Sequence, residues 1–281
     1  MIKKIFKKFP FFVILLSLAG NLFAEDSPAA EKEFNLFGSQ EVFAVSPVTD
    51  GILFGSGVLL SGGSLFTKNI LKLNRQEYDG RTYDKDDVNS FDRIFMNQYS
   101  KTKDTVADVF LAGVLASPAV LLATDKSEWF TCAVMYAETL MISNGIKEMV
   151  KLMVDRPRPY MYYDAGTYPE DVSKDGDWCD SFPSGHSTMV FASATFTSYT
   201  FCKYFPESYW RIPVVAGSYA LAVSTAALRI MSGNHFMTDV VSGAILGSAV
   251  GFFVPWLHTF NTKHDLNVGL LSNGVSISLR F

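Results

Sequence analysis

The chain has 281 residues, of which 48% are hydrophobic and 19% are charged. This balance lies between that of a soluble globular protein and that of a polytopic membrane protein. The formal net charge of −4, without any long basic stripe, argues against nucleic acid as a partner. The cysteines are widely spaced and odd in number, so they predict neither a metal site nor a disulfide framework; they are Cys132, Cys179 and Cys202.

The N-terminus has the layout of an export signal. Four lysines among residues 2–8 precede an apolar core of about a dozen residues, and Ala24 is a plausible cleavage point. Residues 1–24 are therefore predicted to be a signal peptide. An uncleaved first membrane helix is the alternative, because the bulky Leu22 occupies a position where signal peptidases prefer small residues. Both interpretations place residue 25 onward outside the cytoplasm.

Residues 25–104 are expected to form an N-terminal extracytoplasmic segment. Within it, residues 51–66 are apolar but contain five glycines. We interpret them as a helix or a membrane-surface segment rather than a membrane span. Residues 72–104 are rich in charge and are expected to form a loop.

The following part of the chain, residues 105–258, is expected to be one helical domain. Its apolar blocks have lengths of about 17–25 residues, which suits a bilayer span. Their glycine, alanine and serine content would allow close helix packing. The predicted fold is all-α, a membrane-embedded bundle of about five or six helices, with a soluble apolar bundle as the alternative. The blocks are residues 105–124, 129–154, 184–204, 212–231 and 235–257.

Residues 259–281 are expected to be a tail that carries a small β-hairpin. Asn273-Gly274 is a favourable two-residue turn, and apolar residues alternate from Val275 to Phe281. The terminal aromatic is similar to the end of an outer-membrane barrel strand, but one hairpin cannot close a barrel.

Three groups of polar residues stand at the ends of the apolar blocks. The first is "KLMVDRPRPY", where Lys151, Arg156 and Arg158 crowd together as prolines stop the preceding helix. Such a group of cations can bind phosphate, and arginine does so through two parallel hydrogen bonds. The alternative is a basic collar at a membrane surface.

The second group is "SFPSGHS", residues 181–187. Ser184 is well placed to cap the following helix, and Gly185 lets a ligand approach the backbone. Free N–H groups at a helix start bind phosphate readily, and His186 lies in that first turn. A plain helix cap with an incidental histidine is the alternative.

The third group is "ALRIMSGNHFMTD". If residues 235–257 are helical, His235 and Asp239 lie on one face and in contact. The carboxylate would fix the imidazole tautomer and leave the other ring nitrogen free to attack, while Arg229 folds back over the site. The alternative is a buried histidine–aspartate pair that only stabilises the fold. His258 and His264 have no partner pattern and are expected at the surface.

Together these groups resemble the signature of the type 2 phosphatidic acid phosphatase family, which also includes vanadium haloperoxidases and bacterial acid phosphatases. Lys151 through Arg158-Pro159 matches its first part, and Pro183-Ser184-Gly185-His186 matches its second. Arg229, His235 and Asp239 match its third part with the expected gaps. The resemblance covers residues 105–258. Leu228 departs from it, because the family usually has serine before this arginine.

The resemblance implies that His235 is the nucleophile, that Asp239 orients it, and that His186 protonates the leaving oxygen. It implies further that the phosphate oxygens are held by a set of groups from all three segments: Lys151, Arg158, Ser184, the Gly185 N–H and Arg229. No metal or other cofactor is expected at this site, and Arg156 would be an auxiliary contact. The acidic, aromatic residues 160–180 would cover the site or remain a solvated loop.

The expected protein is therefore a metal-independent phosphatase in a bacterial inner membrane, with a lipid phosphate as its substrate and its site facing the periplasm. That orientation requires that residues 51–66 do not span; if they span, the site faces the cytoplasm. The rival interpretations are a soluble periplasmic acid phosphatase, a vanadium-dependent haloperoxidase and a non-catalytic binder of lipid phosphate.

Overall fold

A computed structural model describes most of the chain after the N-terminal segment. The described residues are 42–71, 78, 80–170, 172, 177–263, 265–271 and 274–280. The predicted signal peptide or first helix and His264 lie outside them.

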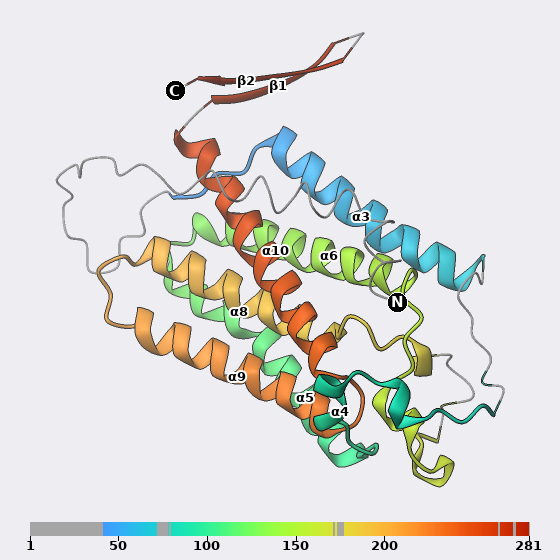
Figure 1. The fold of residues 1–281 in the computed structure, drawn as a ribbon. Helices are drawn as coiled ribbons and strands as arrows, with labels where there is room; N and C mark the ends of the chain where they lie inside the picture. The colour runs from blue at the N-terminus through green and yellow to red at the C-terminus, as the bar shows by residue number, and fades with distance from the viewer. Residues whose placement is uncertain are drawn as a thin grey trace. The chain divides into compact units, whose positions relative to one another are not determined.

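The described chain is a helical bundle, as the sequence predicts (Figure 1). Short 3₁₀ turns and loops connect its α-helices. The helices are α3 (Pro47–Asn69), α4 (Ser90–Ile94), α5 (Lys101–Leu115), α6 (Glu128–Lys151), α8 (Gly185–Tyr204), α9 (Arg211–Met231) and α10 (Met237–Lys263). The 3₁₀ turns are η1 (Lys85–Asp87), η2 (Ser117–Ala123), η3 (Pro159–Tyr162), η4 (Ala165–Thr167) and η5 (Asp177–Cys179).

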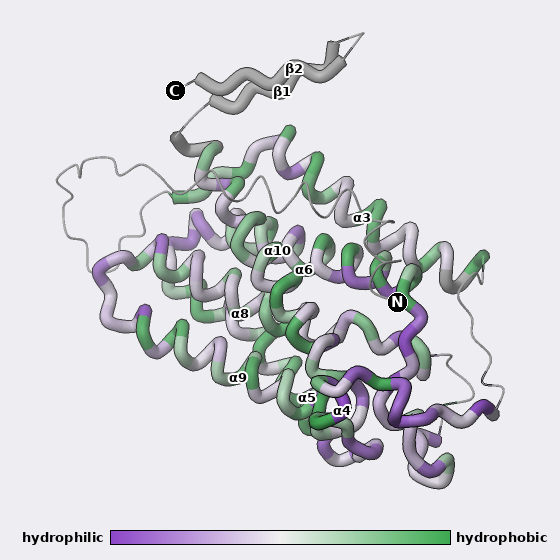
Figure 2. Tube along the Cα trace, viewed as in Figure 1, coloured by the Kyte–Doolittle hydropathy of each residue, from purple (hydrophilic) through white to green (hydrophobic). Residues whose placement is uncertain are grey.

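The helices have the length and the apolar surface expected of a membrane protein. Four segments of the described chain are long and apolar enough to cross a bilayer. Hydrophobic residues run along α3, α9 and α10, whereas hydrophilic residues gather in the loops around α4 (Figure 2). Large apolar side chains on α3, α5, α9 and α10 point outward, among them Leu59, Val109, Val223 and Ile245. A lipid environment makes such exposure favourable, since the surrounding chains are as apolar as the side chains. The four segments are Pro47–Thr67, Lys101–Ala123, Arg211–Met231 and Met237–Phe260.

Helix α8 occupies the centre of the bundle and packs against α5, α6, α9 and α10. Its closest neighbour is α10, which presents a glycine every fourth residue. A methyl group added at Gly247 would lie 2.1 Å from the Thr188 carbonyl oxygen, and Gly243 and Gly251 are similarly close to the α8 backbone. Only hydrogen fits at this interface. The glycines thus bring the first turn of α10 against the first turn of α8.

Helix α3 lies along α6 and runs in the same direction. Gly57 contacts Met141, and Leu60 contacts Gly145, so the register advances together along both helices. Helix α3 confirms the helical alternative for residues 51–66, and by length and composition it could also cross a bilayer. Two glycines allow the two helices to approach closely: Gly57 of α3 lies against Met141, and Gly145 of α6 lies against Leu60.

Several element boundaries differ from the predicted ones. Pro118 divides the first predicted block into α5, which already begins at Lys101, and the 3₁₀ turn η2, because proline removes a backbone donor. Helix α10 begins at Met237, after His235, and continues through the start of the predicted tail to Lys263. The predicted loop 72–104 contains α4 and η1.

After α10 the chain forms two antiparallel strands, β1 (Asp265–Leu271) and β2 (Gly274–Arg280). Leu271 pairs with Gly274, and Asp265 pairs with Arg280. Gly274 is therefore part of a strand rather than of the predicted turn.

Candidate active site

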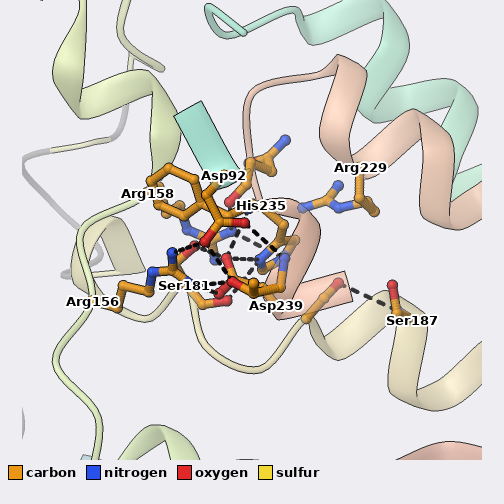
Figure 3. A network of polar contacts seen from close by, with 12 residues as sticks. Asp92, Arg156, Arg158, Ser181, Ser187, Arg229, His235 and Asp239 are labelled. Carbon is orange, nitrogen blue, oxygen red and sulfur yellow. Dashed lines mark hydrogen bonds and ion pairs between the residues drawn. The ribbon is translucent and has the colours of Figure 1, made fainter. Parts of the chain in front are cut away.

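The three polar segments come together at one end of the bundle, where α6 and α9 end and where α8 and α10 begin (Figure 3). The Ser184 N–H donates to the Asp239 carbonyl oxygen at 3.0 Å, which joins the second segment to the third. Nη1 of Arg158 lies 3.3 Å from Nε2 of His235, which joins the first segment to the third. Residues that are up to 88 positions apart in the sequence therefore share one site.

His235 is 2% exposed and lies just before α10. Its Nδ1 is 2.8 Å from the backbone carbonyl oxygen of Ser181, which can only accept, so Nδ1 carries a hydrogen. Its Nε2 faces Arg158, which can only donate, so Nε2 has a free lone pair. The two contacts define the same neutral tautomer. Burial, together with the charges of Arg158, Arg229 and Lys151, lowers the pKa of His235 well below its ordinary value of 6.5.

The expected contact between His235 and Asp239 is replaced by a looser arrangement. Nδ1 of His235 is 3.8 Å from Oδ2 of Asp239, beyond hydrogen-bond distance. The Ser181 carbonyl takes the role predicted for the carboxylate, because His235 stands outside the helix and is not one helical turn from Asp239. Oδ2 of Asp239 instead accepts from the Ser181 hydroxyl at 2.6 Å and from the Phe236 N–H at 2.8 Å. Asp239 thus ties Ser181, whose carbonyl binds the imidazole, to the backbone next to His235.

Arg156 bridges two buried carboxylates and is not positioned as an auxiliary contact to a ligand. One of its nitrogens pairs with Asp239, and the other lies 2.7 Å from Oδ2 of Asp92. Its guanidinium carbon also lies 4.1 Å from the centre of the Phe236 ring. Asp92 is fully buried and accepts from the Thr238 N–H and hydroxyl. Burial alone would raise the pKa of Asp92, but these hydrogen bonds outweigh it and lower the pKa.

Arg158 is buried and uses its donors on several partners. It pairs with the Asp177 carboxylate, donates from Nε to the Asp177 carbonyl at 2.8 Å, and donates to the Asn234 carbonyl at 3.1 Å. Asp177 belongs to the 160–180 connection, so this connection contacts the site directly.

Arg229, at the end of α9, is likewise buried beside a carboxylate, that of Asp104. Asn234 donates to the same carboxylate at 3.0 Å. The buried Nε of Arg229 has no hydrogen-bond partner among the described residues. Leu228, where the sequence departs from the family signature, is half-buried in the same helical turn.

His186 points toward a third carboxylate. Its Nε2 lies 2.7 Å from Oδ1 of Asp108. Burial and the positive charge of Arg229 lower the pKa of His186 to about 4, although Asp108 opposes this shift. The imidazole is thus neutral at pH 7 when the site is without an anion.

The start of α8 has the predicted cap. The Ser184 hydroxyl accepts from the Ser187 N–H, and Ser184 itself is completely buried. Gly185 is next to the Lys147 side chain, one helical turn before Lys151. Lys151 is buried, and desolvation together with the charge of Arg158 lowers its pKa to about 8.

A cavity of about 200 Å³ opens beside these residues. Arg229 and His186 line it, whereas His235 is not among its lining residues, since Arg158 covers Nε2. The lining residues are Tyr99, Asp104, Asp108, Tyr160, Pro169, Val172, Asp177, Trp178, His186, Arg229 and Asn234. Positive charges, neutral imidazoles and the N–H groups of a helix start are groups that can bind an anion.

The sequence reasoning missed the carboxylates that accompany the cations. Asp104 and Asp108 carried a usable signal, since like charges four residues apart on a helix repel unless a cation lies nearby. Asp92 follows Asn89, a typical N-cap residue, and the Asn89 side chain does accept from the Asp92 N–H. Ser181 contributes to the imidazole through its carbonyl group, for which a sequence gives no signal.

The fold and this site define a helical membrane protein with a cation-rich polar cluster that contains two histidines. Residues 133–263 match the family model of the PAP2 superfamily. Over 110 residues it is 30% identical to a lipid A 1-phosphatase of Rhizobium johnstonii, covering 39% of this chain and 41% of that one. Over 129 residues it is 30% identical to lipid phosphate phosphatase gamma of Arabidopsis thaliana, covering 44% and 52%. The chain spans about half the length of the curated relatives that it matches.

Among solved structures, the chain is similar to a transmembrane PAP2 type phosphatidylglycerolphosphate phosphatase from Bacillus subtilis. The identity is 18%, the TM-score is 0.42, and the match covers 76% of this chain and 96% of that one.

Proposed function

We propose that this protein hydrolyses a phosphate monoester or diphosphate group of a lipid through a phosphohistidine intermediate. The observation that carries the proposal is the tautomer of His235: Nδ1 is held by the Ser181 carbonyl, so the Nε2 lone pair faces the cationic site. The two curated relatives named above are lipid phosphatases, which supports the same class of substrate. Candidate substrates are phosphatidate, phosphatidylglycerol phosphate, undecaprenyl diphosphate and the phosphates of lipid A.

In the first step, Nε2 of His235 attacks phosphorus and forms an N–P bond. The bond between phosphorus and the lipid oxygen breaks, and this oxygen takes a proton from His186. In the second step, water attacks phosphorus, His186 accepts its proton, and the N–P bond breaks. Inorganic phosphate leaves, and both histidines return to their starting states.

Phosphate binding would exchange one set of anions for another. Arg158 and Arg229 are paired with Asp177 and Asp104, and the guanidinium of Arg158 covers the nucleophile. A phosphate dianion offers more oxygens and more charge than either carboxylate, so it would take over these donors and draw Arg158 off Nε2. Lys151, Ser184 and the Gly185 N–H would complete the set of donors to the phosphate.

An incoming phosphate dianion would also raise the pKa of His186, since negative charge favours the imidazolium form. The histidine would then hold the proton that the leaving oxygen needs. All charge stabilisation in this scheme comes from side chains and N–H groups of the chain, so turnover is expected to continue in EDTA.

We propose further that the protein lies in a bacterial inner membrane with this site on the periplasmic side. Because α3 runs parallel to α6, a spanning α3 has its Pro47 end on the face opposite to the site. If α3 spans, a periplasmic site therefore requires that the residues just before Pro47 be cytoplasmic, which contradicts the predicted export of residue 25 onward. If α3 does not span, the two predictions agree. With a spanning α3, an exported segment 25–46 would place the site in the cytoplasm instead. Labelling of single cysteines introduced at the exposed residues Asp86 and Glu207, in intact cells, tests the orientation. Labelling at position 86 alone is expected, and labelling at position 207 alone contradicts it.

The catalytic proposal is tested with purified protein in detergent, EDTA and a panel of the four lipid phosphates. Wild type is expected to release inorganic phosphate, and His235→Ala is expected to lose at least about 10³-fold in rate. Wild type quenched in alkaline detergent should carry an alkali-stable, acid-labile phosphoryl group that His235→Ala lacks. Hydrolysis by His235→Ala at the wild-type rate would overturn the mechanism, and binding without hydrolysis of any phosphate would support a non-catalytic binder.

A further inference from the structure

A second cluster of ionisable side chains lies at the other end of α10, where the sequence predicted a surface histidine. His258 is instead fully buried, and its Nε2 lies 2.7 Å from Oδ1 of Asp50 and 3.3 Å from Oε2 of Glu138. The three residues come from α10, α3 and α6. A histidine after an apolar block looks exposed in the sequence, but α3 and α6 cover it in the bundle.

The orientation of the imidazole is fixed by the backbone. Nδ1 of His258 is 2.9 Å from the carbonyl oxygen of Val254, one helical turn earlier. That oxygen only accepts, so Nδ1 carries a hydrogen, and a neutral ring presents the Nε2 lone pair to both carboxylates. Three electron-rich groups then face one another, which is unfavourable without a positive charge between them.

The carboxylate of Glu138 lacks its normal partners. The side chain is 0% exposed, and neither of its oxygens accepts a hydrogen bond within the described part of the chain. Among described residues, no lysine or arginine forms an ion pair with Glu138, Asp50 or His258. A buried carboxylate without a cation or a donor is costly, so the group must take up either a proton or a bound cation.

The geometry is suitable for a metal ion. One ligand atom from each residue, an imidazole nitrogen and two carboxylate oxygens, lies within 4.8 Å of the other two. The second oxygen of Asp50 accepts from the Ser46 N–H at 2.5 Å, which leaves Oδ1 directed at the cluster. The contact of Nδ1 with Val254 is the kind of outer hydrogen bond that orients metal-binding histidines. Asp50 retains 14% exposure of its side chain, so water can complete the coordination.

We propose that Asp50, Glu138 and His258 bind a divalent transition-metal ion, with Zn²⁺ as the ion that best fits one imidazole and two carboxylates. The ion supplies the positive charge that the cluster lacks and joins α3 to α6 and α10. It is a structural ion at the end of the bundle opposite to the phosphate site and takes no part in the proposed hydrolysis.

The test uses the full-length protein, purified in detergent, stripped with EDTA, reloaded with Zn²⁺ and desalted. Metal analysis is expected to find about one zinc ion per chain in wild type, and zinc should raise the melting temperature. Glu138→Gln and His258→Ala are expected to lose both effects. Co²⁺ in place of zinc should give visible absorption bands that the same variants lack.

His186→Ala is the matched control. It removes a histidine of the phosphate site, so it should lose phosphatase activity and keep its zinc. Equal zinc content in wild type and Glu138→Gln would overturn the proposal, as would a wild type that neither retains zinc nor changes its melting temperature. Glu138→Gln preserves the size of the side chain, so it remains informative if His258→Ala does not fold. Loss of zinc with retained hydrolysis in EDTA would support the metal site independently of the enzymatic proposal.

Discussion

Two clusters, one at each end of α10, contain the same kinds of groups but differ in whether a cation of the chain pairs with their carboxylates. Each has one buried histidine whose Nδ1 binds a backbone carbonyl, and each has two acidic side chains nearby. At the proposed phosphate site, Arg156 lies between Asp92 and Asp239 and pairs with both. At the opposite end no described cation lies between Asp50 and Glu138.

The role of a buried carboxylate in this protein depends mainly on its partners. Where the chain provides a guanidinium, the carboxylates are satisfied, and they can hold a loop and a nucleophile in place. Where it provides none, the same groups indicate a ligand from solution. The two ends therefore predict opposite responses to substitution.

The largest effect is expected from Arg156→Gln. It would leave Asp92 and Asp239 buried without their shared cation, at a cost of about 3–5 kcal/mol in stability. Thermal unfolding in detergent, with phosphatase assays on the folded fraction, measures the loss. Lys203→Gln, at an exposed basic residue far from both clusters in sequence, serves as the control. An Arg156→Gln protein as stable as wild type would show that the bridge does not hold this end together.

A smaller loss of stability is expected from Gly247→Ala, which tests the close packing of α10 against α8 near the proposed phosphate site. The new methyl group would meet the Thr188 carbonyl oxygen, so the two helices must separate. The expected cost is about 1–3 kcal/mol, with reduced turnover because Asp239 moves away from Ser184. Gly217→Ala is the control, since its added methyl group meets nothing within 4 Å. Equal melting temperatures for the two variants would contradict the close packing.

The pH dependence of stability tests the neutral state of His235. Its pKa in the folded protein lies well below 6.5, so below pH 6.5 the unfolded chain binds a proton that the folded chain does not. Stability should therefore fall as the pH decreases from 6.5 toward the folded pKa, by up to about 1.4 kcal/mol per pH unit from this group. His235→Gln should show a shallower decline in the same window. Identical slopes for the two proteins would show that His235 is not held neutral.

The smallest effect, with the opposite sign, is expected from Glu138→Gln in EDTA. Removing an unsatisfied buried charge should leave the metal-free protein as stable as wild type or more stable by about 1 kcal/mol. With zinc present the order should reverse, because only wild type gains from the ion. Melting curves with and without zinc measure both states. A large destabilisation in EDTA would mean that Glu138 has a partner within the protein.

The features that depend on local chemistry could be predicted from the sequence. The apolar blocks predicted the helices because a bilayer requires long runs of apolar residues, and Ser184 predicted the start of α8 because a hydroxyl caps the free N–H groups there. The spacing of Lys151, Arg158, His186, Arg229, His235 and Asp239 predicted one anion site. The glycines of α10 were compatible with close packing but did not reveal which helix they contact.

Only the tertiary structure decided which groups became partners. The Ser181 carbonyl, not Asp239, fixes the imidazole of His235; Arg156 binds Asp92, 64 residues away; and His258 meets Asp50, 208 residues away. Such pairings depend on how helices distant in sequence pack, and a polar residue in a sequence gives no sign of which distant group will neutralise it. The direction of α3 along α6 was decided in the same way, by contacts at Gly57 and Gly145 that no local pattern encodes.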